Sequence, residues 1–274
     1  MADGRVTHFA AWIIETYLRK RVSRAAAALA YFLMLSVFPM LICLYEMLGS
    51  MFPALEDIVL LVDGILPEGM QETILDYIGY ISRNNSDAML WGAVIAMVTS
   101  SAAAFRTMHT MIGEIMGRLR FKGLFSLVFS FAFSLLFPMG VYFAVIVMIT
   151  GNWFIRAAGK YITFINIAES WGWLRFLVLF CLLMLIIYAL YRLTLPRGSR
   201  VSIVPGSVFS SATLVGISMV FSYFIGMSAR YPLVYGSLAS VIILLLWLYV
   251  CGNVLFIGAI INAAAPGFFN PRPQ

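Results

Sequence analysis

Long runs of apolar residues make up most of the chain, and polar residues gather in the segments between them. Each run exceeds the roughly 20 residues that a helix needs to cross about 30 Å of hydrocarbon. Strands are not expected, because open sheet edges leave backbone groups unpaired in lipid and the runs lack alternating polarity. The pattern predicts one all-α membrane domain over residues 1–274, with six spans near 25–51, 88–112, 123–151, 172–195, 201–228 and 235–264.

Composition supports the membrane assignment. Hydrophobic residues make up 62% of the chain and charged residues 11%, against about 45–50% and about 25% in soluble domains. The net charge of +6 does not predict a nucleic-acid partner, because the basic residues lie at the ends of apolar runs. The three cysteines lie inside apolar runs, so neither a disulfide framework nor a metal site is predicted, and no cofactor is expected.

The distribution of Lys and Arg predicts the orientation. With the N-terminus in the cytoplasm, twelve of the 18 Lys and Arg residues lie at cytoplasmic ends and Arg106 lies within a helix, while the external segments hold Arg83, Arg156, Lys160, Arg175 and Arg230. Basic residues are enriched on the cytoplasmic side of membrane proteins. Both termini are therefore predicted in the cytoplasm of a bacterial cell, with the chain in the plasma membrane.

The N-terminal segment, residues 1–24, has an amphipathic pattern. Phe9, Trp12, Ile13 and Tyr17 share one helical face, and basic residues lie elsewhere. Such a helix lies in the membrane interface and favours anionic lipids. We therefore expect anionic lipids as partners at the cytoplasmic face.

The loop between the first two spans, residues 52–87, is acidic and external. Ile74, Leu75, Ile78 and Ile81 repeat at helical spacing, and Pro67 suits a helix start. The loop is expected to carry a short amphipathic helix on the outer surface. Its acidic residues are interpreted as a solvated face, because no metal-ligand spacing is present.

Charged and kinked positions inside the spans are the first candidates for function. A charge within hydrocarbon is costly and usually serves a purpose. Arg106 is expected near the inner leaflet, either reaching the headgroups there or serving a site. Pro39 and Pro138 are expected to kink the first and third helices, as in many transporters, although such kinks occur in membrane helices of every function.

The fifth span is rich in Gly, Ser and Thr, unlike the uniformly apolar fourth span. Small residues permit close helix packing, and hydroxyl groups alternatively line a polar passage. We expect the fourth helix to face lipid and the fifth to be buried beside the second. Self-association into a homo-oligomer is compatible with this packing.

A polar cavity is predicted toward the outer leaflet, between the first, fifth and sixth spans. Glu46 lies near the outer end of its helix, at a depth similar to that of Arg230 in the next external turn. An ion pair between them would satisfy the acid; alternatively, Glu46 simply reaches the water of the outer headgroup layer. The residues expected to line this cavity or act as its gate are Glu46, Ser218, Ser222, Arg230, Tyr231 and Tyr235.

Three stretches resemble the YihY/BrkB family of inner-membrane proteins. They are the run from Ala28 to Pro39, Val204-Pro205-Gly206, and the block from Tyr235-Gly236-Ser237-Leu238 through Gly258-Ala259 to Asn262-Ala263. One departure is Ile260, where family members often have Glu. The resemblance implies six spans, cytoplasmic termini and a link to surface resistance or export of envelope molecules.

Export of a lipid or another envelope amphiphile is therefore the function that we expect. A membrane scaffold that packs against partner proteins uses the same small residues, and a lipid-modifying enzyme would need acids or histidines at one membrane face. The family's former ribonuclease BN label is not supported, because RNA cleavage needs acid–base groups or a metal ion beside a phosphate. The two histidines, His8 and His109, have no carboxylate or serine at a meaningful spacing.

Overall fold

A computed structural model of the chain describes residues 2–49, 86–117, 167–195, 201–227 and 238–269, with 76, 77, 79–81, 83, 128, 130, 131 and 139. These ranges hold six long helices and no strand. The helices are α1 (Ala2–Arg19), α2 (Val22–Gly49), α5 (Asp87–Ile115), α7 (Ile167–Thr194), α8 (Val204–Met227) and α10 (Leu238–Phe269).

Four helices are long and apolar enough to cross a membrane: Val22–Glu46, Asp87–Ile115, Val204–Phe221 and Val241–Ala264. Within α7, Phe180–Thr194 is a shorter apolar stretch. The all-α membrane fold is therefore confirmed, and the helices coincide with five of the six predicted spans. The other span, 123–151, lies outside the described residues apart from four isolated positions, as does its Pro138.

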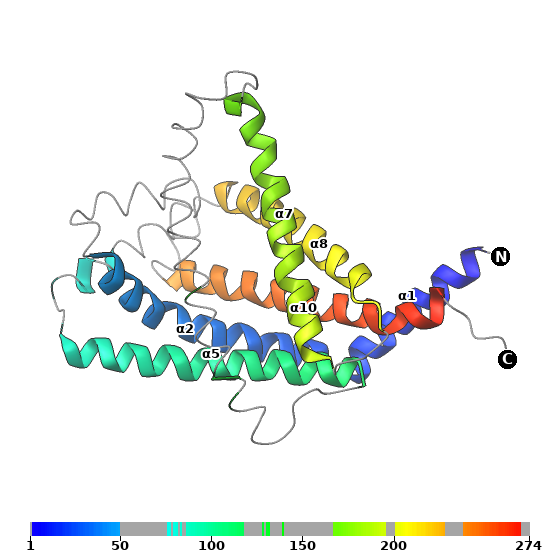
Figure 1. Cartoon of the computed structure of the whole chain (residues 1–274), viewed down its shortest axis with the longest axis horizontal. Helices are drawn as coiled ribbons and strands as arrows, with labels where there is room; N and C mark the ends of the chain where they lie inside the picture. Colours follow the sequence, from blue (N-terminus) through cyan, green and yellow to red (C-terminus); the bar gives the residue numbers. More distant parts are fainter. Residues whose placement is uncertain are drawn as a thin grey trace.

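The helices converge at the end of the molecule where α1 lies, which we call the α1 end (Figure 1). There α2 begins, α5 and α7 end, α8 begins and α10 ends. The antiparallel pair α2 and α5 packs along its length, and α10 packs against both α2 and α8. Toward the opposite end α7 and α8 diverge from the other helices, so the shape is narrow at the α1 end.

The largest buried core lies at this narrow end and draws on every long helix. In lipid the apolar residues of such a core stabilise the fold by close van der Waals packing, because the surrounding hydrocarbon is as apolar as the helix interface. The core residues include Val22, Ala26, Met108, Ile112, Ile187, Tyr191, Phe256 and Ile260. Ile260 therefore belongs to the packed core.

The α1 helix docks on the bundle with the face that the sequence assigned to the membrane. Trp12, Ile13 and Tyr17 pack against the core, and α1 contacts α10. Ile14 and Leu18 on another face are 60% and 67% exposed. The helix is confirmed, these three residues are partly buried against the core, and the placement of the helix in the lipid interface stays a prediction.

A sharp break separates α1 from α2. Arg21 has a φ of 54°, in the left-handed region that non-glycine residues seldom adopt. Its backbone N–H donates to the carbonyl of Leu18, which closes the end of α1. Packing resumes directly after the turn, because Val22 is fully buried in the core.

Two predictions about packing are wrong. The second span does not lie beside the fifth: α5 packs mainly on α2, while α8 packs on α10 and α7. Nor is the fifth helix buried throughout, since Met219 and Val220 in its second half are 46% and 69% exposed. The fourth helix exposes Leu182 and Leu185 as expected.

Pro39 lies within α2 and does not end it, since the helix continues to Gly49. The loop between α2 and α5 is described only at a few positions from 76 to 83, and these are helical. Among them Ile81 is fully buried against residues of α2 and α5, including Met40, Ile42, Ala93 and Met97. The rest of the predicted external helix lies outside the described residues.

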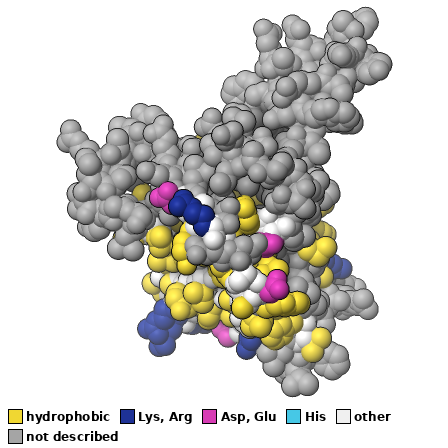
Figure 2. Space-filling view, turned by 90° about the vertical axis from the view of Figure 1, so that its left-hand side faces the viewer, with side chains coloured by type: hydrophobic (Ala, Val, Ile, Leu, Met, Phe, Trp, Pro, Cys, Tyr) yellow, Lys and Arg dark blue, Asp and Glu magenta, His cyan; other side chains and the backbone are white. Residues whose placement is uncertain are grey.

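A view from the end opposite α1 shows mostly hydrophobic side chains among the described residues, with few charged groups (Figure 2). Large hydrophobic side chains are also exposed along the sides of the helices, such as Ile95, Leu185 and Val220, and such side chains are costly in water and stable in lipid. The chain is therefore a membrane protein by its helix lengths and by the chemistry of its described surface.

Candidate functional site

The first turn of α8 is completed by a side chain from α10. Pro205 has no backbone N–H, and the N–H of Gly206 lies too early in the helix to find an intrahelical acceptor. Asn262 supplies the acceptor, with its Oδ1 2.7 Å from the Gly206 nitrogen. Both residues are fully buried or nearly so. The α8 N-terminus is therefore capped across a helix–helix interface.

Two glycines bring α8 and α10 into backbone contact. A Cβ added at Gly206 would meet the backbone oxygen of Gly258, and one added at Gly258 would meet Ser210 and Tyr191. No other residue is small enough for this approach. The pair is a small-residue helix crossing of the kind that membrane interfaces favour.

The same junction carries buried hydroxyl groups. The Tyr191 hydroxyl from α7 donates to the Leu255 carbonyl at 2.6 Å. Ser210 lies 3.1 Å from that hydroxyl and 3.2 Å from the Val254 carbonyl, and has one proton to share between them. Hydrogen bonds thus join α7, α8 and α10 at one depth.

A second polar cluster joins α1, α2 and α10. The Tyr17 hydroxyl donates to Asn253 Oδ1 at 2.7 Å, and the Ser23 and Tyr249 hydroxyls lie 2.8 Å apart. Burial and the neighbouring Tyr249 raise the pKa of Tyr17, so the Tyr17 hydroxyl keeps its proton and remains a donor. Beside this cluster a Cβ at Gly252 would lie 3.4 Å from the Cβ of Ala26. The α1 end is therefore closed by close packing and by hydrogen bonds.

The outer cavity predicted from the sequence is only partly described. Glu46 lies in α2, and its Oε1 is buried with no hydrogen-bond partner among the residues that the structure describes. Arg230, Tyr231 and Tyr235 lie outside the described residues, so the ion pair with Glu46 stays a prediction. Ser218 is half-buried in α8. Ser222 belongs to α8, but its side chain is outside the described set.

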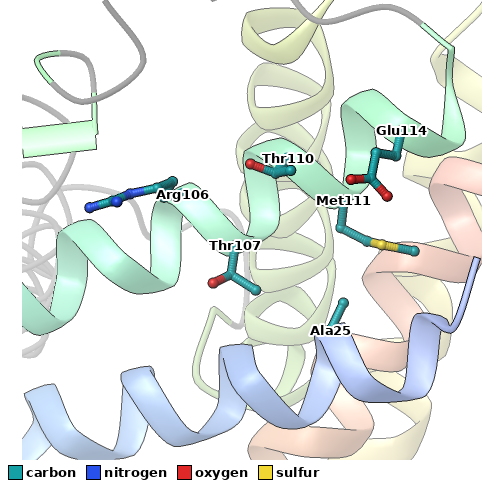
Figure 3. Close-up of a pocket in the computed structure, with 6 residues that line it drawn as sticks. All are labelled: Ala25, Arg106, Thr107, Thr110, Met111 and Glu114. Carbon is teal, nitrogen blue, oxygen red and sulfur yellow. The ribbon is translucent and has the colours of Figure 1, made fainter. Parts of the chain in front are cut away.

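A hollow of about 380 Å³ opens between α2 and α5 near the α1 end (Figure 3). Most of its lining comes from α5, and α2 contributes one small residue. The lining residues are Ala25, Arg106, Thr107, Thr110, Met111 and Glu114. Arg106, Thr110 and Glu114 are exposed, so polar groups occur here on the surface of a helix with the length and composition of a span.

Tyr191 and Asn253 were not among the residues singled out from the sequence, and Tyr17 and Asn262 were noted only for the amphipathic face and the family resemblance, not for these contacts. Asparagine within an apolar run was a usable signal, because an amide in lipid must find partners. The tyrosines gave no such signal, because tyrosine is common in membrane helices at the interface. Their importance depends on helices that are distant in the sequence.

The comparisons with known proteins decide the family. The model of the virulence factor BrkB family matches residues 13–272, which includes the last part of α1 and all the other long helices. The chain belongs to the BrkB family. No solved structure matches the chain.

The relatives of this BrkB-family chain are distant. It is 23% identical over 246 residues to YfkH of Bacillus subtilis, which is named as ribonuclease-like, covering 87% of this chain and 88% of YfkH. It is 25% identical to a UPF0761 membrane protein of Aromatoleum aromaticum, covering 92% of this chain and 62% of that protein. A UPF0761 membrane protein of Neisseria meningitidis serogroup B is 23% identical, with 96% and 64% covered. The chain thus spans less than two thirds of these two longer relatives.

Proposed function

We propose that this chain is a plasma-membrane transporter that exports a lipid or another amphiphile, with the α1 end in the cytoplasm. The observation that carries the proposal is the contrast between the two ends of the bundle. Close packing and hydrogen bonds hold the helices together at the α1 end, and α7 and α8 diverge toward the other end. A bundle closed at one membrane face fits one state of a transporter that opens alternately to the two sides.

The helices fall into two groups that could separate at the α1 end. One is the pair α2 and α5, and the other is the pair α7 and α8 together with α10, which packs against α2 as extensively as against α8. The groups meet chiefly where α2 contacts α10, at Ser23, Ala26, Tyr249 and Gly252. Interhelical hydrogen bonds in membranes contribute only about 0.6 kcal/mol on average. Opening this interface would therefore cost little free energy for each interhelical hydrogen bond that breaks.

Locking this interface tests the proposal. In a variant without native cysteines, Ala26→Cys and Gly252→Cys place two Cβ atoms 3.4 Å apart, close to the spacing of a disulfide. We expect the oxidised double variant to lose translocation of a fluorescent short-chain phosphatidylglycerol in proteoliposomes, and reduction to restore it. Dithionite quenching of the outer-leaflet fluorophore measures the rate.

Each single-cysteine variant is the matched control and should translocate at the wild-type rate under both conditions. Equal rates for the oxidised and reduced double variant would refute the gate. A wild-type rate no higher than that of protein-free vesicles, across phosphatidylglycerol and phosphatidylethanolamine probes, would favour the scaffold function instead.

The proposal assigns no catalytic role to the chain. The described residues contain no group of three His, Cys, Asp or Glu side chains placed to hold a metal ion. His109 is buried in α5 and stacks on Phe105, in a helix with the length and composition of a span. This position does not favour contact with RNA.

The orientation gives a separate prediction. Arg19, Arg21 and Arg24 are exposed at the α1 end, which favours the cytoplasmic side. In a cysteine-free background, single cysteines placed next to Asp63 or Glu72 should react with an impermeant maleimide added to intact cells. Cysteines next to Arg120 or Ser199 should react only after permeabilisation. The reverse pattern would place the α1 end outside.

A further inference from the structure

A polar stripe runs along one exposed face of α5. Thr99, Arg106, Thr110 and Glu114 are all exposed and follow one another at seven, four and four residues, so they lie on one face of the helix. The buried residues of α5, such as Ala104, Met108 and Ile112, lie on the other side. Polar side chains on the outer face of a membrane helix are costly unless they meet a polar group.

Arg106 is the charged centre of this stripe. It lies nine residues before Ile115, about 14 Å along the helix from the α1 end. Its side chain extends toward the N-terminal part of α5 and away from Glu114 (Figure 3). A guanidinium can reduce the free-energy cost of a charge in hydrocarbon by reaching the headgroups. To reach those at the α1 end, the Arg106 side chain would have to point in the opposite direction.

The hollow beside Arg106 offers room for a ligand and additional polar atoms. It is lined by both threonines that follow Arg106 and extends to Ala25 of α2. The Thr107 hydroxyl donates to the Ala103 carbonyl at 2.9 Å and keeps free lone pairs. Among the described residues no acceptor is found for the Thr110 hydroxyl, which can donate to an anion.

We propose that this stripe binds the phosphate of a membrane glycerophospholipid, with Arg106 and Thr110 as the phosphate-binding residues. A guanidinium presents paired N–H donors that match a phosphate. The acyl chains would remain in the surrounding lipid, since the stripe lies on an exposed face. The inference deepens the proposed function, on which it rests, by naming the substrate class and a loading site on the outer face of α5.

The position of the acid restricts how the ligand is bound. Glu114 lies two turns from Arg106, nearer the α1 end, so a phosphate is attracted at one end of the hollow and repelled at the other. The bound phosphate is therefore held deeper than the headgroup layer. A lipid held in this way has begun the movement that translocation completes.

Binding of dioctanoyl phosphatidylglycerol to the purified full-length protein in detergent tests the site, measured by titration calorimetry. We expect Arg106→Gln to weaken binding by roughly 10-fold to 100-fold, the factor that corresponds to one charge-assisted hydrogen bond. Arg106→Lys should retain part of the affinity. Arg192→Gln, which removes an exposed arginine of α7 at the same end, is the matched control and should bind like the wild type.

Two further ligands identify the source of the phosphate. Dioctanoylglycerol, which lacks the phosphate, should bind at least tenfold more weakly than the phospholipid, by the same reasoning. Inorganic phosphate should not compete at equal concentration. Wild-type affinity in Arg106→Gln, with an unchanged melting midpoint, would overturn the site, as would equal binding of dioctanoylglycerol or competition by inorganic phosphate.

The site and the proposed function fail in different ways. If Arg106→Gln loses phospholipid binding while the wild type translocates no lipid, the binding site stands and the transport function does not. If the wild type translocates lipid and Arg106→Gln binds like the wild type, transport stands and this site does not.

Discussion

Replacing Gly206 by alanine should destabilise the protein by about 1–3 kcal/mol or more, the usual cost of overpacking. The added methyl group would meet the backbone oxygen of Gly258 and the Asn262 amide, and backbone atoms cannot move aside as a flexible side chain can. The effect should appear as a lower thermal unfolding midpoint of the purified protein and a smaller monodisperse peak on size-exclusion chromatography.

Gly216 on the same helix provides the control. A Cβ there meets nothing within 4 Å, and alanine is the better helix former by up to about 1 kcal/mol. Gly216→Ala should therefore leave the midpoint unchanged or raise it. If both substitutions had the same effect, the close approach of α8 and α10 would be absent from the folded protein.

Replacing Asn262 by alanine should cost about 1–3 kcal/mol, because it leaves the buried N–H of Gly206 without an acceptor. Asn253→Ala is the matched comparison in the same helix. Asn253 is half-buried, so solvent can replace part of its contact with Tyr17. Its loss should cost less, near the average of about 0.6 kcal/mol for interhelical bonds in membranes. The two melting midpoints, compared under one detergent condition, give the ranking, and a larger effect at Asn253 would contradict the capping role.

The existence of the helices could be predicted because apolar length alone determines whether a segment can cross a membrane. The neighbours of each helix could not, because lipid is as apolar as a helix interface and a membrane helix need not alternate polar and apolar faces. The fifth span illustrates this: Ser207 and Ser211 are buried, while Val208 and Phe209 between them are exposed. Small residues marked a contact face correctly, but they did not identify α10 as the partner.

The candidate site could be predicted only in part, because the sequence shows which residues are unusual in an apolar run but not which residues they contact. Arg106 was evident as a charge within an apolar run, and the structure adds the direction of its side chain and the adjoining hollow. The roles of Tyr191 and Asn262 depend on pairings with residues 19 and 56 positions away. No local pattern in the sequence encodes such a pairing.

The dependence of α8 on Asn262 has a consequence for synthesis. The cap of the first turn of α8 and contacts that dock α1, α2 and α8 come from α10, which is synthesised after these three helices. Until then the N–H of Gly206 lacks its acceptor from α10, so α8 can insert but cannot complete its first turn. A nascent chain that stops short of Asn262 therefore lacks the side chain that joins α8 to α10. Membrane proteases should remove such a chain as readily as one that lacks several helices.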